Sequence, residues 1–197
     1  MDRIILASAS PRRKQLLEWA EIPFDIVPSG SDELIPDGMR TAEVPVFLAR
    51  EKAAFVRQKI GADKIILAAD TVVVLDDQIL GKPVDREDAI RILTLLSART
   101  HQVITGVSLS RGEQEILFSE TTSVRFHPIS QNGIAHYVDH YRPYDKAGAY
   151  AIQEWIGVTG IHSIEGDFYN VMGLPVSRVV QELRKLMVNC QLSIVNC

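Results

Sequence analysis

Residues 64–75 read KIILAADTVVVL, an apolar run that only Asp70-Thr71 interrupts. A short run of apolar and mostly β-branched residues predicts a strand that is buried in a sheet. Asp76-Asp77 then offers a hairpin turn, and residues 78–80 form a short return strand. The run therefore predicts a buried strand that carries one carboxylate, that of Asp70, into apolar surroundings.

An ionised carboxylate in apolar surroundings is unfavourable unless it is paired, binds a metal or borders a cleft. Carboxylates also bind hard cations and act as general bases. Asp70 is therefore the first candidate for a functional residue. The alternative is a structural aspartate whose carboxylate accepts backbone N–H groups where the strand breaks.

Outward from this strand, apolar periodicity predicts a series of strands and helices. A helix is expected over 41–60, with Thr41 as its cap and an apolar stripe that includes Val44 and Leu48. Hairpins within an alternating chain predict an α/β fold with a mixed sheet. Further strands are expected at 3–7, 24–27, 101–110, 115–126 and 161–165, and further helices at 11–20, 85–97, 130–140 and 175–187.

The composition is that of an ordinary globular protein, with 46% hydrophobic residues among 197. We expect one domain over residues 1–197 without a linker, and neither a membrane span nor a signal peptide, since no apolar run nears about 20 residues. Both cysteines, Cys190 and Cys197, lie at the C-terminal end and cannot staple the body of the chain, which favours a cytoplasmic location. The net charge of −4 argues against polymeric nucleic acid as a partner.

The segment Ser8-Ala9-Ser10-Pro11-Arg12-Arg13 joins a predicted strand to a predicted helix. Ser10 can cap this helix, and Pro11 can take its first position. A helix N-terminus presents unpaired N–H groups and the positive end of the helix dipole. With serine hydroxyls and two guanidinium groups it predicts a phosphate site. The alternative is a capped helix with two solvated arginines.

Other signals are weaker. Lys52 lies at the edge of its helix's apolar stripe, from which it can reach into a cleft or extend to water. Lys82 lies in the turn Gly81-Lys82-Pro83, which lacks the P-loop pattern. Residues 145–150 place small residues beside a charged pair, either for the close approach of a ligand or as a surface turn. The sequence contains neither Gly-x-Ser-x-Gly nor Gly-x-Gly-x-x-Gly, which disfavours a serine hydrolase or a dinucleotide-binding enzyme.

Together with further short motifs, these segments resemble the Maf family of nucleoside triphosphate pyrophosphatases. The resemblance runs from residue 4 to about residue 186, and the number and order of the motifs make it specific. The motifs are Ser8-Ala9-Ser10-Pro11-Arg12-Arg13, Leu48-Ala49-Arg50-Glu51-Lys52-Ala53, Ala69-Asp70-Thr71-Val72-Val73, Gly81-Lys82-Pro83, Thr105-Gly106-Val107, the segment from Asp145 to Gln153, and Gly173-Leu174-Pro175.

The resemblance implies an elongated α/β fold with a mixed sheet, of the Maf/ITPase-like type, in which two lobes flank a cleft. It implies hydrolysis of a nucleoside triphosphate to the monophosphate and pyrophosphate, with a divalent cation, Mg²⁺ or Mn²⁺, as cofactor. Asp70 would be the proton acceptor, and Asp70 and Glu33 would hold the metal. By the same resemblance, the catalytic residues are Asp70, Lys52, Lys82 and Glu33, and the substrate-binding residues are Ser8, Arg12, Arg13, Thr71 and Gln153.

Arg12, Thr71 and Gln153 match the trio of the branch that hydrolyses dTTP and UTP. A glutamine amide has both a donor and an acceptor, which suits the carbonyl and imide N–H of a pyrimidine. The alternatives are specificity for 7-methyl-GTP and a non-catalytic nucleotide sensor that regulates cell division. We expect a small-molecule nucleotide substrate, no membrane partner and a homodimer.

Overall fold

The structure is a computed structural model that describes residues 3–30 and 34–195, those after 187 by their backbone alone. Its strands form one mixed sheet with the order β2-β1-β3-β5-β6-β7, and β4 pairs with β3. The expected mixed α/β fold is therefore confirmed. The strands are β1 (Ile4–Leu6), β2 (Phe24–Ile26), β3 (Ile66–Leu75), β4 (Gln78–Leu80), β5 (Thr100–Arg111), β6 (Gln114–Phe126) and β7 (Ile161–Glu165).

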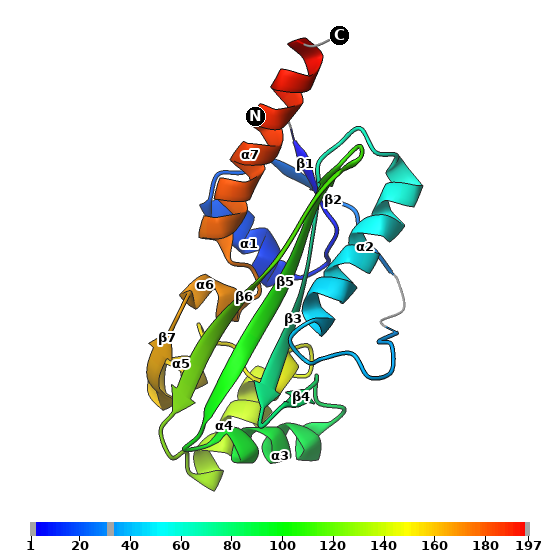
Figure 1. Cartoon of the computed structure of the whole chain (residues 1–197). Helices are drawn as coiled ribbons and strands as arrows, with labels where there is room; N and C mark the ends of the chain where they lie inside the picture. Colours follow the sequence, from blue (N-terminus) through cyan, green and yellow to red (C-terminus); the bar gives the residue numbers. More distant parts are fainter. Residues whose placement is uncertain (1–2, 31–33, 196–197) are drawn as a thin grey trace.

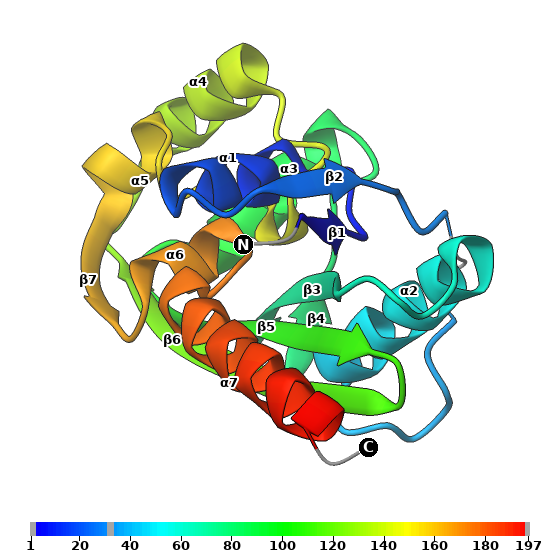
Figure 2. The same ribbon diagram turned by 90° about the horizontal axis from the view of Figure 1, so that it is seen from above.

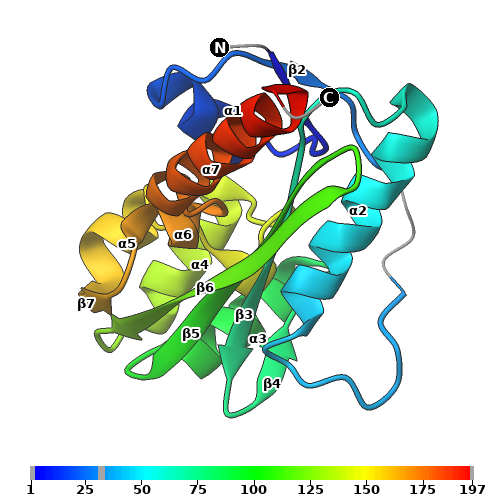
Figure 3. The ribbon, with the colours of Figure 1, turned by 45° about the horizontal axis from the view of Figure 1, so that its top comes forward.

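The helices cover the sheet from two sides. Figure 1 shows the long strands β3, β5 and β6 running through the molecule, with α2 along one side and α1, α6 and α7 along the other, and Figure 3 shows the same separation of α2 from α7. Seen from above, β3 and β5 lie between α2 and the side that carries α1 and α6 (Figure 2). The helices are α1 (Pro11–Trp19), α2 (Val44–Ile60), α3 (Arg86–Leu96), α4 (Gln131–Tyr141), the 3₁₀ turn η1 (Ala147–Ala149), α5 (Trp155–Gly160), α6 (Phe168–Met172) and α7 (Val176–Val195).

Successive side chains of β3 serve different cores. Because side chains alternate along a strand, Asp70 lies on the face that α2 covers, and Thr71 lies on the opposite face. The even-numbered Ile66, Ala68, Val72 and Val74 belong to the two small cores on the α2 side, and the odd-numbered Leu67, Ala69, Val73 and Leu75 belong to the main core.

One edge of β3 changes neighbours at its centre. β5 pairs with the whole of one edge, from Ile66 to Val74. On the other edge, β1 pairs with β3 only at residues 66–67, and β4 pairs with β3 only from Val73 to Leu75. Within the described part of the chain, neither of these strands accompanies residues 68–72. The sheet is therefore open on this side at Asp70 and Thr71.

Most expected elements are found within a few residues of their predicted bounds, and α3 begins after the capping side chain of Asp85 as the pattern indicates. The expected end of the last helix at residue 187 is wrong, because α7 continues to Val195 through residues that include neither glycine nor proline. The expected start of the second helix at Thr41 is wrong, because α2 begins at Val44 and the Thr41 hydroxyl donates to the carbonyl of Asp77 at 3.1 Å. Pro45 explains the difference, since proline is favourable only in the first turn of a helix. Asp70-Thr71 does not break β3, and α5 and α6 were not expected from the sequence.

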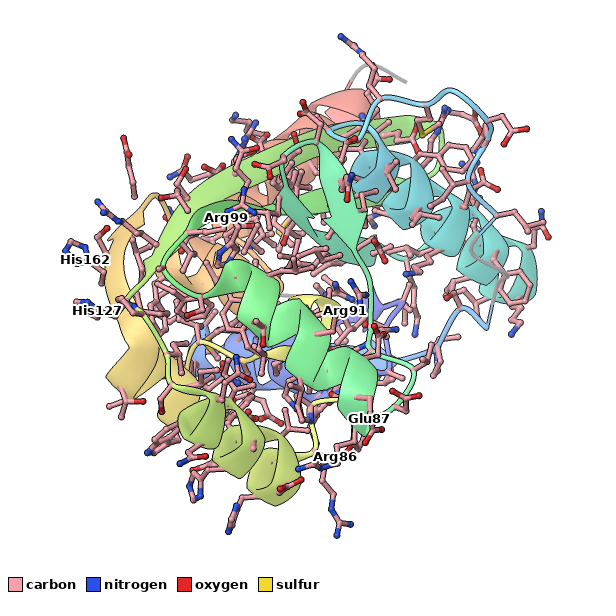
Figure 4. The ribbon with its side chains drawn as sticks, turned by 90° about the horizontal axis from the view of Figure 1, so that it is seen from below. Arg86, Glu87, Arg91, Arg99, His127 and His162 are labelled. Carbon is pink, nitrogen blue, oxygen red and sulfur yellow. The ribbon has the colours of Figure 1, made fainter. Side chains whose placement is uncertain are left out.

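Helices α3 and α4 close the lower end of the molecule. Arg86 of α3 donates two hydrogen bonds to Asp139 of α4, at 2.6 and 2.9 Å, and Figure 4 shows Arg86 where the two helices meet.

None of the helices in the described ranges combines the length and the apolar character needed to cross a membrane. Cys197 and the side chain of Cys190 lie outside the described residues. The single domain over residues 1–197 and its division into two lobes stay predictions.

Candidate functional site

The open edge of β3 borders a cavity of about 510 Å³. Its walls come from the end of β1, the start of α1, α2, β3, the turn after β4 and the segments around residues 145–151 and 171–173. Most of the predicted site residues lie in this lining, although they are far apart in the sequence. These are Ser8, Arg12, Arg13, Lys52, Asp70, Thr71 and Lys82.

An ion pair stands in one wall of the cavity. The Nζ atom of Lys52 lies 2.5 Å from Oδ1 of Asp70, and the two side chains are only 12% and 11% exposed. Two charges this poorly hydrated are stable when each compensates the other. Lys52 therefore reaches the cleft rather than extending to water, and Asp70 meets an ammonium group rather than occupying a break in its strand.

A glycine brings α2 close enough for this contact. Gly106 of β5 lies directly opposite Asp70 of β3. A Cβ atom at this position would stand 2.2 Å from the backbone carbon of Pro45 and the backbone nitrogen of Val46, both in the first turn of α2. No real side chain fits at that distance. The glycine thus lets α2 rest on the sheet beside Asp70, with Lys52 two turns further along the helix.

The N-terminus of α1 forms the opposite wall. Ser10 is the N-cap, its side chain accepts from the backbone N–H of Arg13, and Pro11 stands in the first turn. Ser8 Oγ accepts from the backbone of Ser10 at 3.2 Å and from Nη1 of Arg13 at 3.1 Å. The two serines and the guanidinium group therefore surround the positive end of a helix, which is the arrangement that binds phosphate.

A second group of charges lines the cavity beyond Arg12. Nη1 of Arg12 donates to Oδ2 of Asp145 at 2.9 Å, and Lys146 donates to Oδ1 of the same carboxylate at 2.7 Å. Partial burial raises the pKa of Asp145, but the hydrogen bonds from Lys146 and Arg12 outweigh burial and leave that pKa below its ordinary value. The Asp145 carboxylate is therefore a fixed negative charge between two cations.

Lys146 is in turn connected to the interior. Its Nζ atom lies 3.5 Å from Glu154, whose other oxygen accepts a hydrogen bond from the Tyr137 hydroxyl. Burial first, and the Glu154 carboxylate second, raise the pKa of Tyr137. The sequence allowed residues 145–150 to be either a ligand-contacting segment or a surface turn, and the structure places Lys146 buried in the cavity wall. Its only sequence signal was the small-residue segment that follows it.

Three of the predicted site residues are not among those whose contacts in the cavity wall are described above. Lys82 lines the cavity after β4 but is exposed, and it makes no hydrogen bond or ion pair with any other described residue. Gln153 is exposed and does not belong to the lining, because the chain turns outward after the buried Ile152 to begin α5. Glu33 lies outside the described residues.

Histidines do not contribute to the cavity. None of the lining residues is a histidine. His127 and His162 contact each other, with ring centroids 4.8 Å apart, and Figure 4 shows both pointing away from the ribbon. The described lining has two carboxylates, and Asp145 is held between Arg12 and Lys146. Asp70, at the open edge of β3, is the carboxylate that suits proton abstraction.

The carboxylates of the described lining suit a divalent cation that is shared with a bound phosphate. Among the described residues, no three or more His, Cys, Asp or Glu side chains gather into a metal site. Mg²⁺ is commonly held by one or two carboxylates together with substrate phosphates and water. Asp70, which borders the cavity opposite the N-terminus of α1, fits that mode of binding.

Comparison with known proteins supports the family resemblance that the short motifs carry. The family described as Maf-like protein matches residues 3–186. A protein named dTTP/UTP pyrophosphatase from Bacteroides fragilis is 46% identical over 185 residues, which cover 93% of this chain and 96% of that protein. A protein of the same name from Cytophaga hutchinsonii is 48% identical over 183 residues, which cover 93% of this chain and 84% of that protein.

Among solved structures, a nucleoside-triphosphatase (dITP/XTP pyrophosphatase) from Mycobacterium abscessus aligns with 98% of this chain and 100% of its own, at 16% identity and a TM-score of 0.45. This is a distant likeness. The family match and the two relatives, by contrast, extend over nearly the whole chain, and the family match includes all of the described cavity wall. The resemblance carried by the motifs is confirmed, and this chain belongs to the family of Maf-like proteins.

Proposed function

We propose that this protein hydrolyses nucleoside triphosphates, with dTTP and UTP as its substrates, to the nucleoside monophosphate and pyrophosphate. The names of the relatives support this reaction and this choice of base. The observation that carries the proposal is the Lys52–Asp70 pair, which shares one cavity with Arg13 and the N-terminus of α1. A base and a phosphate-binding wall thereby face the same space.

The triphosphate would bind along the cationic wall. Arg13, Ser8 and the first N–H groups of α1 offer donors for phosphate oxygens. Lys82, exposed at the rim, supplies a further positive charge. Lys52 can turn from Asp70 to a phosphate oxygen when the substrate enters, because its flexible ammonium group carries three donors.

Asp70 would act as the general base. As the oxygen of a water molecule forms a bond to the α-phosphorus, the bond between that phosphorus and the oxygen bridging to the β-phosphorus breaks. The water proton passes to the Asp70 carboxylate, and pyrophosphate leaves. Lys52, Lys82 and Arg13 stabilise the negative charge that develops on the phosphate oxygens, which is the largest contribution expected from such a site.

A divalent cation, Mg²⁺ or Mn²⁺, would be held by Asp70, by the predicted ligand Glu33 and by the substrate phosphates. When bound, such an ion neutralises phosphate charge and polarises the bonds at phosphorus. The proposal predicts that chelation with EDTA abolishes pyrophosphate release and that adding Mg²⁺ or Mn²⁺ restores it.

Arg12, Thr71 and Gln153 are proposed to select the pyrimidine. Arg12 and Thr71 border the cavity, whereas Gln153 lies outside its lining. The Gln153 amide can therefore contact the base only if the nucleoside extends beyond the cavity.

We further propose that the protein is a homodimer and that it is located in the cytoplasm. Size-exclusion chromatography with light scattering tests the oligomeric state.

The decisive experiment measures pyrophosphate release from dTTP, UTP, dCTP and 7-methyl-GTP with Mg²⁺ and with Mn²⁺. Higher kcat/KM for dTTP and UTP than for the other two supports the proposal. A preference for 7-methyl-GTP would overturn the choice of base. No release from any nucleotide, combined with tight nucleotide binding, would instead favour a non-catalytic sensor.

A further inference from the structure

We propose that Thr105 and Asn170 are positioning residues for Arg13, through a chain of hydrogen bonds that runs along one face of the sheet from β3 to β5 and α6. Neither residue lines the cavity. Both are fully buried, on β5 and α6 respectively. The inference rests on the proposed function, since it assigns to Arg13 the binding of substrate phosphates.

The Arg13 guanidinium is held at each of its three nitrogens. Nε donates to the carbonyl of Gly173 at 2.8 Å, Nη1 to the hydroxyl of Ser8 at 3.1 Å, and Nη2 to the hydroxyl of Thr71 at 3.0 Å. These acceptors come from three different segments of the chain. A planar group held on three sides has a defined orientation, which is what bidentate recognition of phosphate requires.

Two threonine hydroxyls link Arg13 to the interior. Thr105 Oγ1 lies 3.2 Å from the backbone carbonyl of Asn170, to which it can donate, and 2.9 Å from Thr71 Oγ1, a contact in which either hydroxyl can be the donor. The Thr71 hydroxyl also lies 3.5 Å from the carbonyl of Gly173. The Thr71 oxygen accepts from Nη2 of Arg13 at 3.0 Å. Thr105 thus holds in place the hydroxyl that receives the guanidinium group.

Asn170 fixes the far end of the chain. Its Nδ2 atom donates to the carbonyl of Val103 and to the hydroxyl of Thr122, both at 3.0 Å, which ties α6 to β5 and β6. Its Oδ1 atom is buried without a hydrogen-bond partner among the described residues. A buried oxygen without a partner is unfavourable for folding. The role of Asn170 therefore lies in its two donated bonds, which hold α6 against β5 and β6.

The same helix presents the third acceptor. Gly173 follows α6 with φ of 115°, a conformation that favours glycine, and its carbonyl accepts from Arg13. Because Asn170 anchors α6, it places this carbonyl as well as the one that receives Thr105. Two of the three contacts to Arg13 therefore depend on Asn170, and one of those two depends on Thr105.

The test is a double-mutant cycle of Thr105→Val with Arg13→Ala, with Thr105→Ser as the conservative variant. Valine keeps the shape of threonine and removes the hydroxyl. We expect Thr105→Val to lower kcat/KM for dTTP about tenfold, chiefly through KM, the loss that follows when one ordered hydrogen bond to a binding group is removed. Thr105→Ser should stay within about twofold of the wild type. In the Arg13→Ala background, Thr105→Val should change nothing further.

Ser108→Ala is the matched control, because Ser108 is a fully buried hydroxyl on the same strand, without a hydrogen-bond partner among the described residues. It should leave KM unchanged. Asn170→Ala should reproduce the rise in KM of Thr105→Val. The inference would be overturned if Thr105→Val lowered kcat/KM by the same factor in the wild type and in the Arg13→Ala variant. It would also be overturned if Ser108→Ala raised KM as much as Thr105→Val does. Either result would show a structural effect alone.

A second readout separates this inference from the proposed function. The affinity for α,β-imido-dUTP, a triphosphate that cannot be cleaved at the reacting bond, is measured by calorimetry on the same variants. If the wild type releases no pyrophosphate, the proposed reaction is refuted, and the dissociation constants of the same double-mutant cycle decide the role of Thr105. If the effects of Thr105→Val and Arg13→Ala on binding are additive, that role is rejected, and if they are not additive, it is supported.

Discussion

Asp70 and Thr71 are neighbours in the chain, yet their side chains lie on opposite faces of β3 and border the same cavity. This is a consequence of the open edge of β3 between β1 and β4. Asp70 meets Lys52 from α2 on one face, and Thr71 meets Arg13 from α1 on the other. A ligand at the open edge is thus in reach of groups from both layers of helices.

Asp70→Asn tests the proposed base. The amide keeps the shape of the carboxylate but cannot accept a proton from water at neutral pH. We expect kcat for dTTP to fall by about 10²–10⁴-fold, the range attributed to general-base catalysis. Steady-state pyrophosphate release measures this, and calorimetry with α,β-imido-dUTP should show that the nucleotide still binds.

Asp77→Asn provides the control for the same chemical change. Asp77 lies in the exposed turn between β3 and β4 with φ of 61°, a conformation that asparagine tolerates well. Activity should stay within about twofold of the wild type, because a surface substitution of this kind is close to neutral. Retention of kcat by Asp70→Asn would refute the assignment of the base, whatever the result for Asp77→Asn.

Lys52→Met tests the coupling within the ion pair. The substitution leaves the Asp70 carboxylate poorly hydrated and without its ammonium partner, so the free energy of unfolding should fall by about 3–5 kcal/mol. The double variant Lys52→Met/Asp70→Asn should be more stable than the sum of the single effects predicts. Urea unfolding at pH 7 measures all four proteins, and strict additivity would show that the contact is energetically irrelevant.

Much of this architecture is predictable from local patterns. The apolar run at 64–75, the hairpin turn at Asp76-Asp77 and the cap at Asp85 each have a chemical signature confined to a few residues. The start of α2 was predictable too, because Pro45 does not suit the second turn of a helix that begins at Thr41. Local chemistry therefore accounts for the strands and the long helices.

The rest depends on contacts between distant segments. Helices α5 and α6 have six and five residues, too few for an apolar period to show. The side chain of Asn170 fixes α6 through bonds to Val103 and Thr122, which no local pattern announces. Lys146 likewise acquires its role from Asp145 and Glu154 once the segment packs. The motif resemblance grouped Ser8, Arg13, Lys52 and Lys82, but their common cavity follows from the gap in the sheet.

Gly106→Ala tests the approach of α2 to the sheet. The added methyl group would stand 2.2 Å from the backbone of Pro45, so either α2 or β5 must move. Overpacking of this kind costs about 1–3 kcal/mol, and the shift of α2 carries Lys52 away from Asp70. We expect lower stability in urea together with a loss of kcat larger than tenfold, since small misplacements at a reacting centre are costly.

Gly133→Ala is the matched substitution in α4, where the nearest atom to the new methyl group is Ser130 Oγ at 3.3 Å. Alanine is a better helix former than glycine, so stability should change by at most about 1 kcal/mol and activity should be unaffected. If Gly106→Ala were as active as Gly133→Ala, the close packing of α2 would have no bearing on the site.

The burial of His101 leads to a prediction of how the free energy of unfolding depends on pH. It is buried on β5, its Nε2 atom lies 2.7 Å from the Tyr150 hydroxyl, and burial lowers its pKa from 6.5 to about 4. The unfolded chain therefore takes up a proton near pH 6.5 and the folded protein only near pH 4. Stability is lost progressively as the pH falls through this window, by up to about 3 kcal/mol from this residue.

The comparison that checks this is urea unfolding of the wild type and of His101→Gln between pH 7 and pH 4. The variant should be less stable at pH 7, where the neutral imidazole is well packed, but its free energy of unfolding should fall less steeply on acidification. His162→Gln removes an exposed histidine and should leave the slope of the wild type in place. Parallel curves for the wild type and His101→Gln would mean that the buried imidazole is protonated as readily in the folded protein as in the unfolded chain.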